Sequence, residues 1–310
     1  MARRKKGDKI DGWVVLDKPV GLGSTPAVSR VRRLFGAQKA GHGGTLDPLA
    51  SGVLPIALGE ATKTVPFVMD GRKEYRFTVR FGEARSTEDA EGDVTATSDA
   101  RPTDDAIRGA LGGFLGDIEQ VPPAYSALKI DGQRAYDLAR AGETVEMKPR
   151  RVRIEGLALL ARPDRDHADL VVTCGKGTYI RSLGRDLAVA LGTVGHLSAL
   201  RRTAAGPFRE EAAISLPKLE ALGHIPALLG ALVPVVTALD DIPALAVTAE
   251  DAFRLAQGRP IVLVPRQVET LKARLTGGSR LVSAMDGDRL VALAEMRAGR
   301  LNPVRVFIQA

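Results

Sequence analysis

A glycine-rich segment with a single aspartate is the stretch whose residue types could most readily do chemistry. It reads Gly41-His42-Gly43-Gly44-Thr45-Leu46-Asp47-Pro48-Leu49-Ala50-Ser51-Gly52. Glycine permits backbone angles that other residues avoid, so this chain could close tightly around a ligand. Pro48 restricts the backbone of the preceding residue, which holds the Asp47 carboxylate in one direction. Because Asp-Pro and Gly-Gly are also ordinary loop signals, a glycine-rich turn without a catalytic role is the simpler interpretation of these residues alone.

The rest of the sequence offers few competing signatures of catalysis or cofactor binding. The glycine-rich segment does not have the G-x-G-x-x-G pattern, and residues 59–64 lack the Gly-Lys pair of a phosphate-binding loop. The four histidines are widely separated, and no Cys/His spacing suggests zinc. We therefore expect no cofactor and no metal.

The elements that position these residues belong to a chain of 310 residues, a length that predicts two domains of unequal size. Its composition, 45% hydrophobic and 26% charged, is typical of folded proteins. No apolar stretch approaches the ~20 residues that span a bilayer, and Met1–Lys6 do not resemble a signal peptide. The single cysteine, Cys174, fits a reducing compartment. We expect a cytoplasmic protein that does not associate with membranes.

The charge is unevenly distributed along the chain. The net charge of +7 points to a polyanionic partner, but residues 1–10 carry +4 of it and are expected to form a flexible basic tail. Residues 83–117 hold nine acids and three bases, so we expect them to face away from any phosphate backbone. Residues 129–153 are basic, with seven Lys or Arg and four acids.

Hydrophobic spacing predicts a mixture of helices and strands over residues 11–243. Strands are expected at 12–16, 75–81, 151–160 and 168–174. Helices are expected from a Thr25 cap to Gly36, from a Thr103 cap to Leu115, over 178–191 and over 215–229. The glycine-rich residues 40–59 are expected to form a loop.

The pattern changes after Leu245. Thr248 and Asp251 resemble a variant capping box, and the helix that they begin is expected to end at Gly258. Short strands are then expected at 261–264, 280–284, 289–295 and 304–308, with a turn at residues 286–288. We therefore expect a small, mostly β domain over residues 244–310.

The glycine-rich segment is one of several stretches that occur in a characteristic order over roughly residues 11–210. They are Leu16-Asp17-Lys18-Pro19, His42 to Pro55, Gly59 to Lys63, Lys73-Glu74-Tyr75, Gln120 to Lys129, Arg134-Ala135-Tyr136, Ala139 to Gly142, Lys176 to Leu183 and Leu200-Arg201-Arg202-Thr203. Together they resemble the bacterial TruB family of tRNA pseudouridine synthases. Departures at Gly43 and Ser51, and a loose match at 86–89, do not touch Asp47.

This resemblance implies an α+β fold and an isomerase. The expected fold is a mixed, mainly antiparallel sheet with flanking helices over residues 11–243, followed by a PUA-like RNA-binding β domain. The implied reaction converts uridine to pseudouridine at position 55 in the T loop of tRNA, after the base is flipped out of its stack. We expect the T stem-loop of tRNA as partner, no guide RNA, no obligate protein partner and a monomer.

By resemblance, Asp47 is the catalytic carboxylate, Arg181 is its partner, and Tyr75 stacks on the target base. His42 packs where the base left the stack, and the remaining pocket residues are Tyr179 and Leu200. Each of these has a structural alternative, and that of Tyr75 is a core aromatic in its strand. Seven basic residues are expected to contact RNA phosphates: Lys18, Lys63, Arg150, Arg151, Arg153, Arg201 and Arg202.

Three other functions remain open at this stage. An RNA-binding protein or RNA chaperone with a decayed site would bind RNA without product. A hydrolase that uses Asp47 and His42 would act on a small substrate without RNA. A guide-dependent relative within the superfamily would need partner-docking segments.

Overall fold

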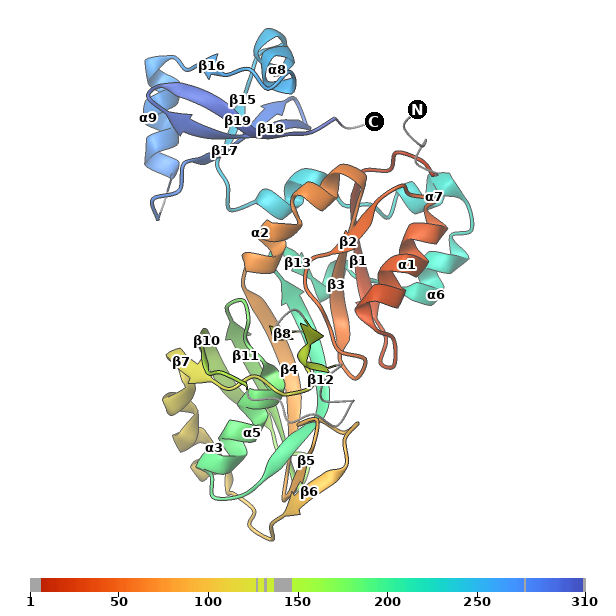
Figure 1. The fold of residues 1–310 in the computed structure, drawn as a ribbon, viewed down its shortest axis with the longest axis vertical. Helices are drawn as coiled ribbons and strands as arrows, with labels where there is room; N and C mark the ends of the chain where they lie inside the picture. The colour runs from red at the N-terminus through yellow and green to blue at the C-terminus, as the bar shows by residue number, and fades with distance from the viewer. Residues whose placement is uncertain (1–6, 127, 131–132, 137–146, 276, 309–310) are drawn as a thin grey trace.

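The computed structural model describes residues 7–126, 128–130, 133–136, 147–275 and 277–308, and its main feature is a long mixed sheet (Figure 1). The strand order is β14-β1-β3-β12-β4-β11-β10-β7, with β13 added to β12 and β2 to β3. The β1–β14 and β3–β12 pairs are parallel, and the other pairs are antiparallel. The strands are β1 (Gly12–Lys18), β2 (Ala40–His42), β3 (Ser51–Leu58), β4 (Lys73–Phe81), β7 (Gly116–Gln120), β10 (Arg150–Ala161), β11 (His167–Cys174), β12 (Gly195–Ala205), β13 (Phe208–Arg209) and β14 (Ile214–Ser215).

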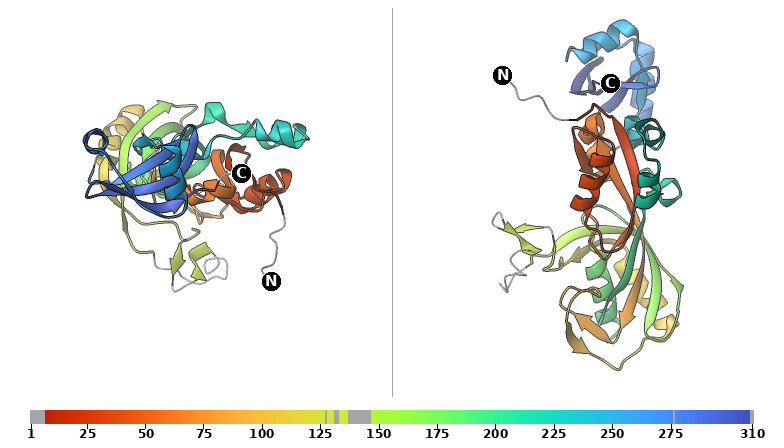
Figure 2. Two further views of the ribbon diagram at one scale, coloured as in Figure 1. Left: turned by 90° about the horizontal axis from the view of Figure 1, so that it is seen from above. Right: turned by 90° about the vertical axis from the view of Figure 1, so that its right-hand side faces the viewer.

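Helices lie along both halves of this sheet. Figure 1 shows α1, α6 and α7 beside the β1–β3 half, and α3 and α5 beside the β10–β11 half. The helices are α1 (Ser24–Leu34), α2 (Val65–Asp70), α3 (Asp104–Leu111), α5 (Ile180–Ala190), α6 (Leu216–Ala221) and α7 (Ile225–Leu229). Short 3₁₀ turns are η1 (Gly59–Lys63), η2 (Gly112–Phe114), η3 (Glu210–Ala212) and η4 (Val235–Leu239). Two hairpins complete this region: β5 (Glu83–Arg85) with β6 (Val94–Thr97), and β8 (Lys129–Ile130) with β9 (Gln133–Arg134). The β8–β9 hairpin stands away from the main sheet (Figure 2).

Strand β1 is buried on both of its faces, which explains its continuous apolar sequence. Val14 and Leu16 belong to the core under α1, while Trp13 and Val15 belong to a second core on the opposite face. Successive side chains in a strand point to opposite faces, so a strand covered on both sides needs an unbroken apolar run. The sheet is therefore a covered central layer at this point.

A second, five-stranded sheet begins at Ala244. Its order is β15-β17-β18-β19-β16, with two helices packed against it. The elements are β15 (Ala244–Ala246), α8 (Ala249–Ala256), β16 (Ile261–Val262), α9 (Pro265–Arg274), β17 (Leu281–Asp286), β18 (Arg289–Arg297) and β19 (Arg300–Val306). This C-terminal unit lies at one end of the long sheet in Figures 1 and 2. Thr248 caps α8 as predicted, by accepting from the Asp251 N–H at 3.2 Å.

Several sequence expectations need correction. Residues 40–59 were expected as a loop but contain β2 and β3, because residues 53–58 are apolar and buried. Helix α1 is capped by Gly23 rather than Thr25. The helix expected over 215–229 is interrupted by Gly223, whose φ is +65°, and β15 and α9 were missed.

Part of the expected N-terminal tail is folded onto the chain. The Asp8 N–H donates to the Gly36 carbonyl at 2.8 Å, and the Gln38 N–H donates to the Asp8 carbonyl at 3.1 Å. The described start of the chain is thus bonded to the residues that follow α1, while residues 1–6 lie outside the described residues. Among the helices that the structure describes, none has the length and apolar character to cross a membrane.

Candidate active site

The loop between β2 and β3 carries Asp47 and is tied to its surroundings on both sides of that residue. The Ser24 hydroxyl donates to the Leu46 carbonyl at 2.8 Å and accepts from the Leu46 N–H at 2.8 Å. The Pro48 carbonyl accepts from Lys18 Nζ at 3.4 Å. Because Ser24 begins α1 and Lys18 ends β1, a helix and a strand together hold the loop.

Asp47 forms an ion pair with Arg181, which lies in the first turn of α5. Asp47 Oδ2 lies 2.8 Å from Arg181 Nη2, and the two side chains are 40% and 7% exposed. The guanidinium also donates to the carbonyls of Thr87 at 2.9 Å and Tyr125 at 2.8 Å, and Asp89 Oδ2 lies 3.5 Å from Nη1. These contacts fix Arg181, while the Asp47 carboxylate keeps an accessible face that can meet a substrate.

Five of the residues expected at the site line one cavity of about 290 Å³. They are Asp47, Tyr75, Tyr179, Arg181 and Leu200. They come from the loop, from β4, from the residue before α5, from α5 itself and from β12. Burial raises the pKa of both tyrosines, so their phenol groups are neutral at neutral pH. The cavity combines aromatic and apolar walls with one carboxylate.

A larger cavity of about 740 Å³ adjoins the first and contains His42. Asp47 and Arg181 line both cavities. Burial, and then the nearby Arg202 charge, lower the pKa of His42, so its imidazole is neutral at neutral pH. The start of α1 and the tip of the β5–β6 hairpin form further walls of this cavity.

The acidic residues 83–117, expected to face away from any phosphate backbone, return to the active site at the hairpin tip. Glu88 forms an ion pair with Arg185 of α5, and this contact folds the tip back toward Arg181. The tip then places acidic side chains along the larger cavity. These are Asp89, Glu91 and Asp93. The distribution of charge along the sequence did not reveal this return of the chain.

Comparison with known proteins agrees with this geometry. Residues 32–180 match the TruB family pseudouridylate synthase N-terminal domain, and residues 181–240 match the tRNA pseudouridylate synthase B C-terminal domain. A tRNA pseudouridine synthase B from Caulobacter sp. (strain K31) is 64% identical over 99% of each chain. One from Gluconacetobacter diazotrophicus is 55% identical over 98% of this chain and 100% of its own length. The chain belongs to the TruB family. It is therefore a pseudouridine synthase, an isomerase.

Solved structures of related proteins share the fold of this TruB family member. A chain in a Cbf5-Nop10-Gar1 complex is 27% identical, with a TM-score of 0.72 over 96% of this chain and 85% of that chain. A chain in an H/ACA RNP with a bound substrate RNA has a TM-score of 0.71, covers 99% of this chain and 92% of that chain, and at 23% identity shows the fold alone. The predicted α+β class, with a mixed and mainly antiparallel sheet, is confirmed. Family membership sets aside the hydrolase and the non-catalytic alternative.

Two of the seven basic residues expected at RNA phosphates are inside this TruB family member instead. Lys18 is 0% exposed and donates to the carbonyls of Pro19 at 2.9 Å and Leu22 at 2.6 Å. Arg202 is 1% exposed. A buried cation satisfied by backbone carbonyls cannot reach a phosphate, so the expectation is wrong for both residues.

The other five basic residues lie nearer to solvent. Lys63 pairs with Glu60 at 2.5 Å, and Arg201 pairs with Asp17 at 2.9 Å. Exposed side chains on β10 are Arg150, Arg151 and Arg153. Arg153 lies 3.4 Å from Asp117. The β10 arginines are therefore the best placed of the set to meet a phosphate backbone. The family-like residues 139–142 lie outside the described residues.

Two residues at the site were not singled out from the sequence. Asp89 is one of nine acids in its region, and nothing in its spacing marks it as the one beside Arg181. Ser126, 3% exposed, lines both cavities and belongs to the family-like stretch from Gln120 to Lys129, which could have pointed to it. Among the described residues, no cluster of His, Cys, Asp and Glu is arranged to hold a metal ion.

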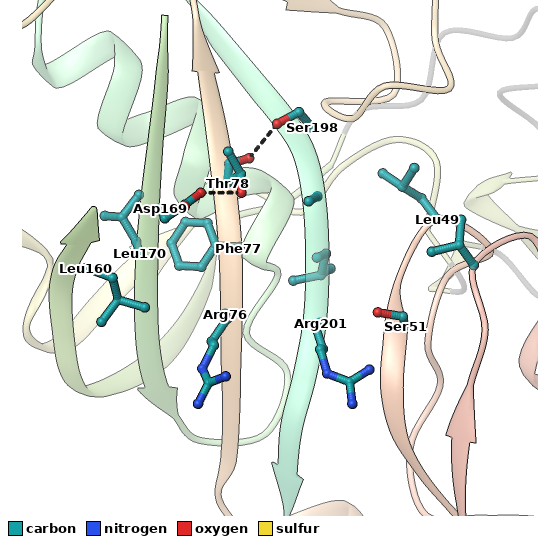
Figure 3. Close-up of a pocket in the computed structure, with 13 residues that line it drawn as sticks. Leu49, Ser51, Arg76, Phe77, Thr78, Leu160, Asp169, Leu170, Ser198 and Arg201 are labelled. Carbon is teal, nitrogen blue, oxygen red and sulfur yellow. Dashed lines mark hydrogen bonds between the residues drawn. The ribbon is translucent and has the colours of Figure 1, made fainter. Parts of the chain in front are cut away.

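A third cavity, of about 390 Å³, is lined by residues of β4, β11 and β12 and shares Leu200 with the first. Figure 3 shows the labelled lining residues that lie on these strands. Arg76 and Thr78 line it and alternate along β4 with Tyr75. The Thr78 hydroxyl donates to Asp169 at 2.6 Å, as Figure 3 shows. Asp47 does not line this cavity, so we do not include it in the active site.

Proposed function

We propose that this protein converts the uridine at position 55 in the T loop of tRNA to pseudouridine, with Asp47 as the catalytic carboxylate and without a guide RNA. The observation that carries the proposal is the position of Asp47, which lines both cavities and is paired with Arg181. The names of the curated relatives support tRNA as the substrate. The reaction breaks the C–N glycosidic bond and joins the same ribose carbon to a ring carbon of uracil, so no atom is gained or lost.

The target base reaches Asp47 by leaving its stack. Flipping a base costs a few kcal/mol, which the enzyme must offset. Tyr75, Tyr179 and Leu200 offer aromatic and apolar surface in the smaller cavity, where the base would lie against Tyr75. His42, which lines the adjoining cavity, is proposed to pack against the RNA where the base has left.

Arg181 keeps the Asp47 carboxylate charged and directed at the substrate. When RNA closes over the site, Asp47 loses water, and desolvation disfavours a charged carboxylate. The guanidinium at 2.8 Å opposes this effect, because a nearby positive charge favours the ionised form. The three further contacts of Arg181, with Thr87, Tyr125 and Asp89, hold its guanidinium in place when the substrate binds and leaves.

The surfaces that hold the rest of the tRNA lie on both structural units. We assign the catalytic domain to residues up to 243 and a PUA-like RNA-binding domain to residues 244–310, whose five-stranded sheet supports this division. The exposed arginines of β10 are proposed to meet the RNA backbone, since guanidinium groups suit phosphate geometry. A single protein chain is proposed to suffice.

The test is to map pseudouridine in an unmodified tRNA transcript after incubation with wild type, Asp47→Asn and Asp169→Asn. Asp169 is a matched control because it lies outside both active-site cavities and bonds Thr78. Wild type and Asp169→Asn should modify the T-loop uridine, while Asp47→Asn should bind tRNA and leave it unmodified. Equal product from Asp47→Asn would overturn the role of Asp47, and product at a different uridine would overturn the proposed target.

A further inference from the structure

Arg202 is a charged side chain in the interior of the protein, at the wall of the smaller active-site cavity. It lies in β12, is 1% exposed and lines the cavity that also holds Asp47 and Tyr75. Burying a guanidinium is costly unless the protein replaces its lost hydration. Within the described part of the chain no carboxylate forms an ion pair with it, so its partners are neutral groups.

The guanidinium connects the two ends of the loop that carries Asp47. Nη2 donates to the Gly44 carbonyl at 3.1 Å, and Nη1 approaches the Thr45 carbonyl at 3.4 Å. Nε donates to the Val53 carbonyl at 2.7 Å, in β3 after the loop. Because the guanidinium is planar and rigid, these contacts fix the chain before Asp47 relative to the chain after it.

The same side chain also contacts Tyr75. Arg202 and Tyr75 are direct partners across the antiparallel β12–β4 pair, and the Arg202 charge opposes the rise that burial causes in the pKa of the Tyr75 hydroxyl. One buried group therefore contacts both the loop of the catalytic carboxylate and the aromatic ring proposed to receive the base. An apolar side chain of similar size would fill the space but would hold neither partner.

We propose that Arg202 is a positioning residue that sets the distance between Asp47 and a base stacked on Tyr75. The proposal rests on the roles assigned above to these two residues. A loop displaced by about 1 Å can slow a reaction about 100-fold, while the surfaces that bind the RNA are unchanged. Arg202 should therefore affect the chemical step much more than tRNA binding.

The experiment measures tRNA affinity and the single-turnover rate at saturating enzyme for Arg202→Met, Arg202→Lys and a control, Arg101→Met. Arg101 also donates to loop carbonyls, those of Ser98 and Ala100, but it lies outside both active-site cavities. Arg202→Met should lose about 100-fold in rate and less than about threefold in affinity. Arg202→Lys keeps the charge but lacks the guanidinium fork, so its rate should fall between those of wild type and Arg202→Met. Arg101→Met should keep the wild-type rate.

A double-mutant cycle with Tyr75→Phe separates positioning from general loss of structure. If Arg202 acts partly through the tyrosine hydroxyl, its substitution should cost about threefold less in the Tyr75→Phe background. Independent, multiplying effects of the two substitutions would overturn the link to Tyr75. A wild-type rate for a folded Arg202→Met or Arg202→Lys would overturn the whole inference, and so would a loss confined to affinity. Because Arg101→Met still reports on turnover, either result would leave the proposed function standing.

Discussion

At the residue scale, three buried cations lie close to the loop that carries Asp47. Lys18, Lys73 and Arg202 are each at most 6% exposed, and each donates to backbone carbonyls of neighbouring turns. Burial lowers the pKa of Lys18 and of Lys73 to about 8, although a carboxylate near each opposes the shift. Lys18 and Arg202 therefore hold the loop itself, and Lys73 holds the turn before β4. For the two lysines, the electrostatic cost of burial falls when they lose a proton.

This cost makes stability depend on pH in a defined window. Lys18 has a pKa of about 8 in the folded protein and an ordinary value of 10.5, so between these values the unfolded chain holds more protons. The free energy of unfolding of wild type should then rise, relative to Lys18→Met, by up to about 1.4 kcal/mol per pH unit over that window. Urea unfolding at pH 7, 8.5 and 10 measures the difference. The exposed Lys272 supplies a control, Lys272→Met, which should track wild type at every pH. A constant difference between wild type and Lys18→Met would contradict the prediction.

The same residues show what the sequence alone can and cannot reveal about the site. Motif order identified Asp47, Tyr75 and Arg181, and the structure brings them into one cavity. Lys18 and Arg202 were assigned to RNA phosphates because a basic residue in a sequence looks solvent-exposed by default. Their burial depends on strands from distant parts of the chain, β12 and β3 among them, and no local pattern encodes that packing.

At the scale of elements, local patterns predicted several strands and helices with one covered face. Strand β4 alternates buried and exposed positions, and α3 begins at its predicted Thr103 cap. Strand β3 was missed because Gly52 and Pro55 are typical of loops, whereas partners on both sides stabilise it here. Helix α9 was missed because it has few buried residues, and its periodicity is correspondingly weak.

Gly52 makes the junction between β3 and β12 testable. Its φ is +96°, and an added Cβ would lie 2.2 Å from the Arg202 carbonyl oxygen. Gly52→Ala should therefore cost more than the ~1–2 kcal/mol of the left-handed conformation alone, because the strands must separate. Gly116→Ala is the matched control, because φ at Gly116 is +86° but an added Cβ there would meet no atom within 4 Å. Urea unfolding should show the larger loss of stability for Gly52→Ala, and equal losses would contradict this account of the junction.

At the scale of the whole molecule, the two structural units share one hydrophobic core. Trp13 and Val15 of β1 belong to the same cluster as Leu293 of β18 and Phe307. Hydrogen bonds strengthen this contact: Lys63 Nζ donates to the Val306 carbonyl at 2.7 Å. The C-terminal unit also has a core of its own under α8 and α9. The +7 net charge of the chain carried no information about this junction, because apolar packing forms it.

A shared core predicts that both units unfold in one cooperative transition. Trp13 is the sole tryptophan of the sequence, so its fluorescence reports on the junction, and its midpoint in urea should coincide with that of far-UV circular dichroism. Phe307→Ala removes a ring that is 5% exposed and should lower the Trp13 midpoint by the equivalent of about 3–5 kcal/mol. Phe253→Ala is the matched control, because that ring is 64% exposed and its loss should leave the midpoint unchanged. If the two units were independent, Phe307→Ala would leave the Trp13 transition at its wild-type midpoint and shift only the signal of the C-terminal sheet.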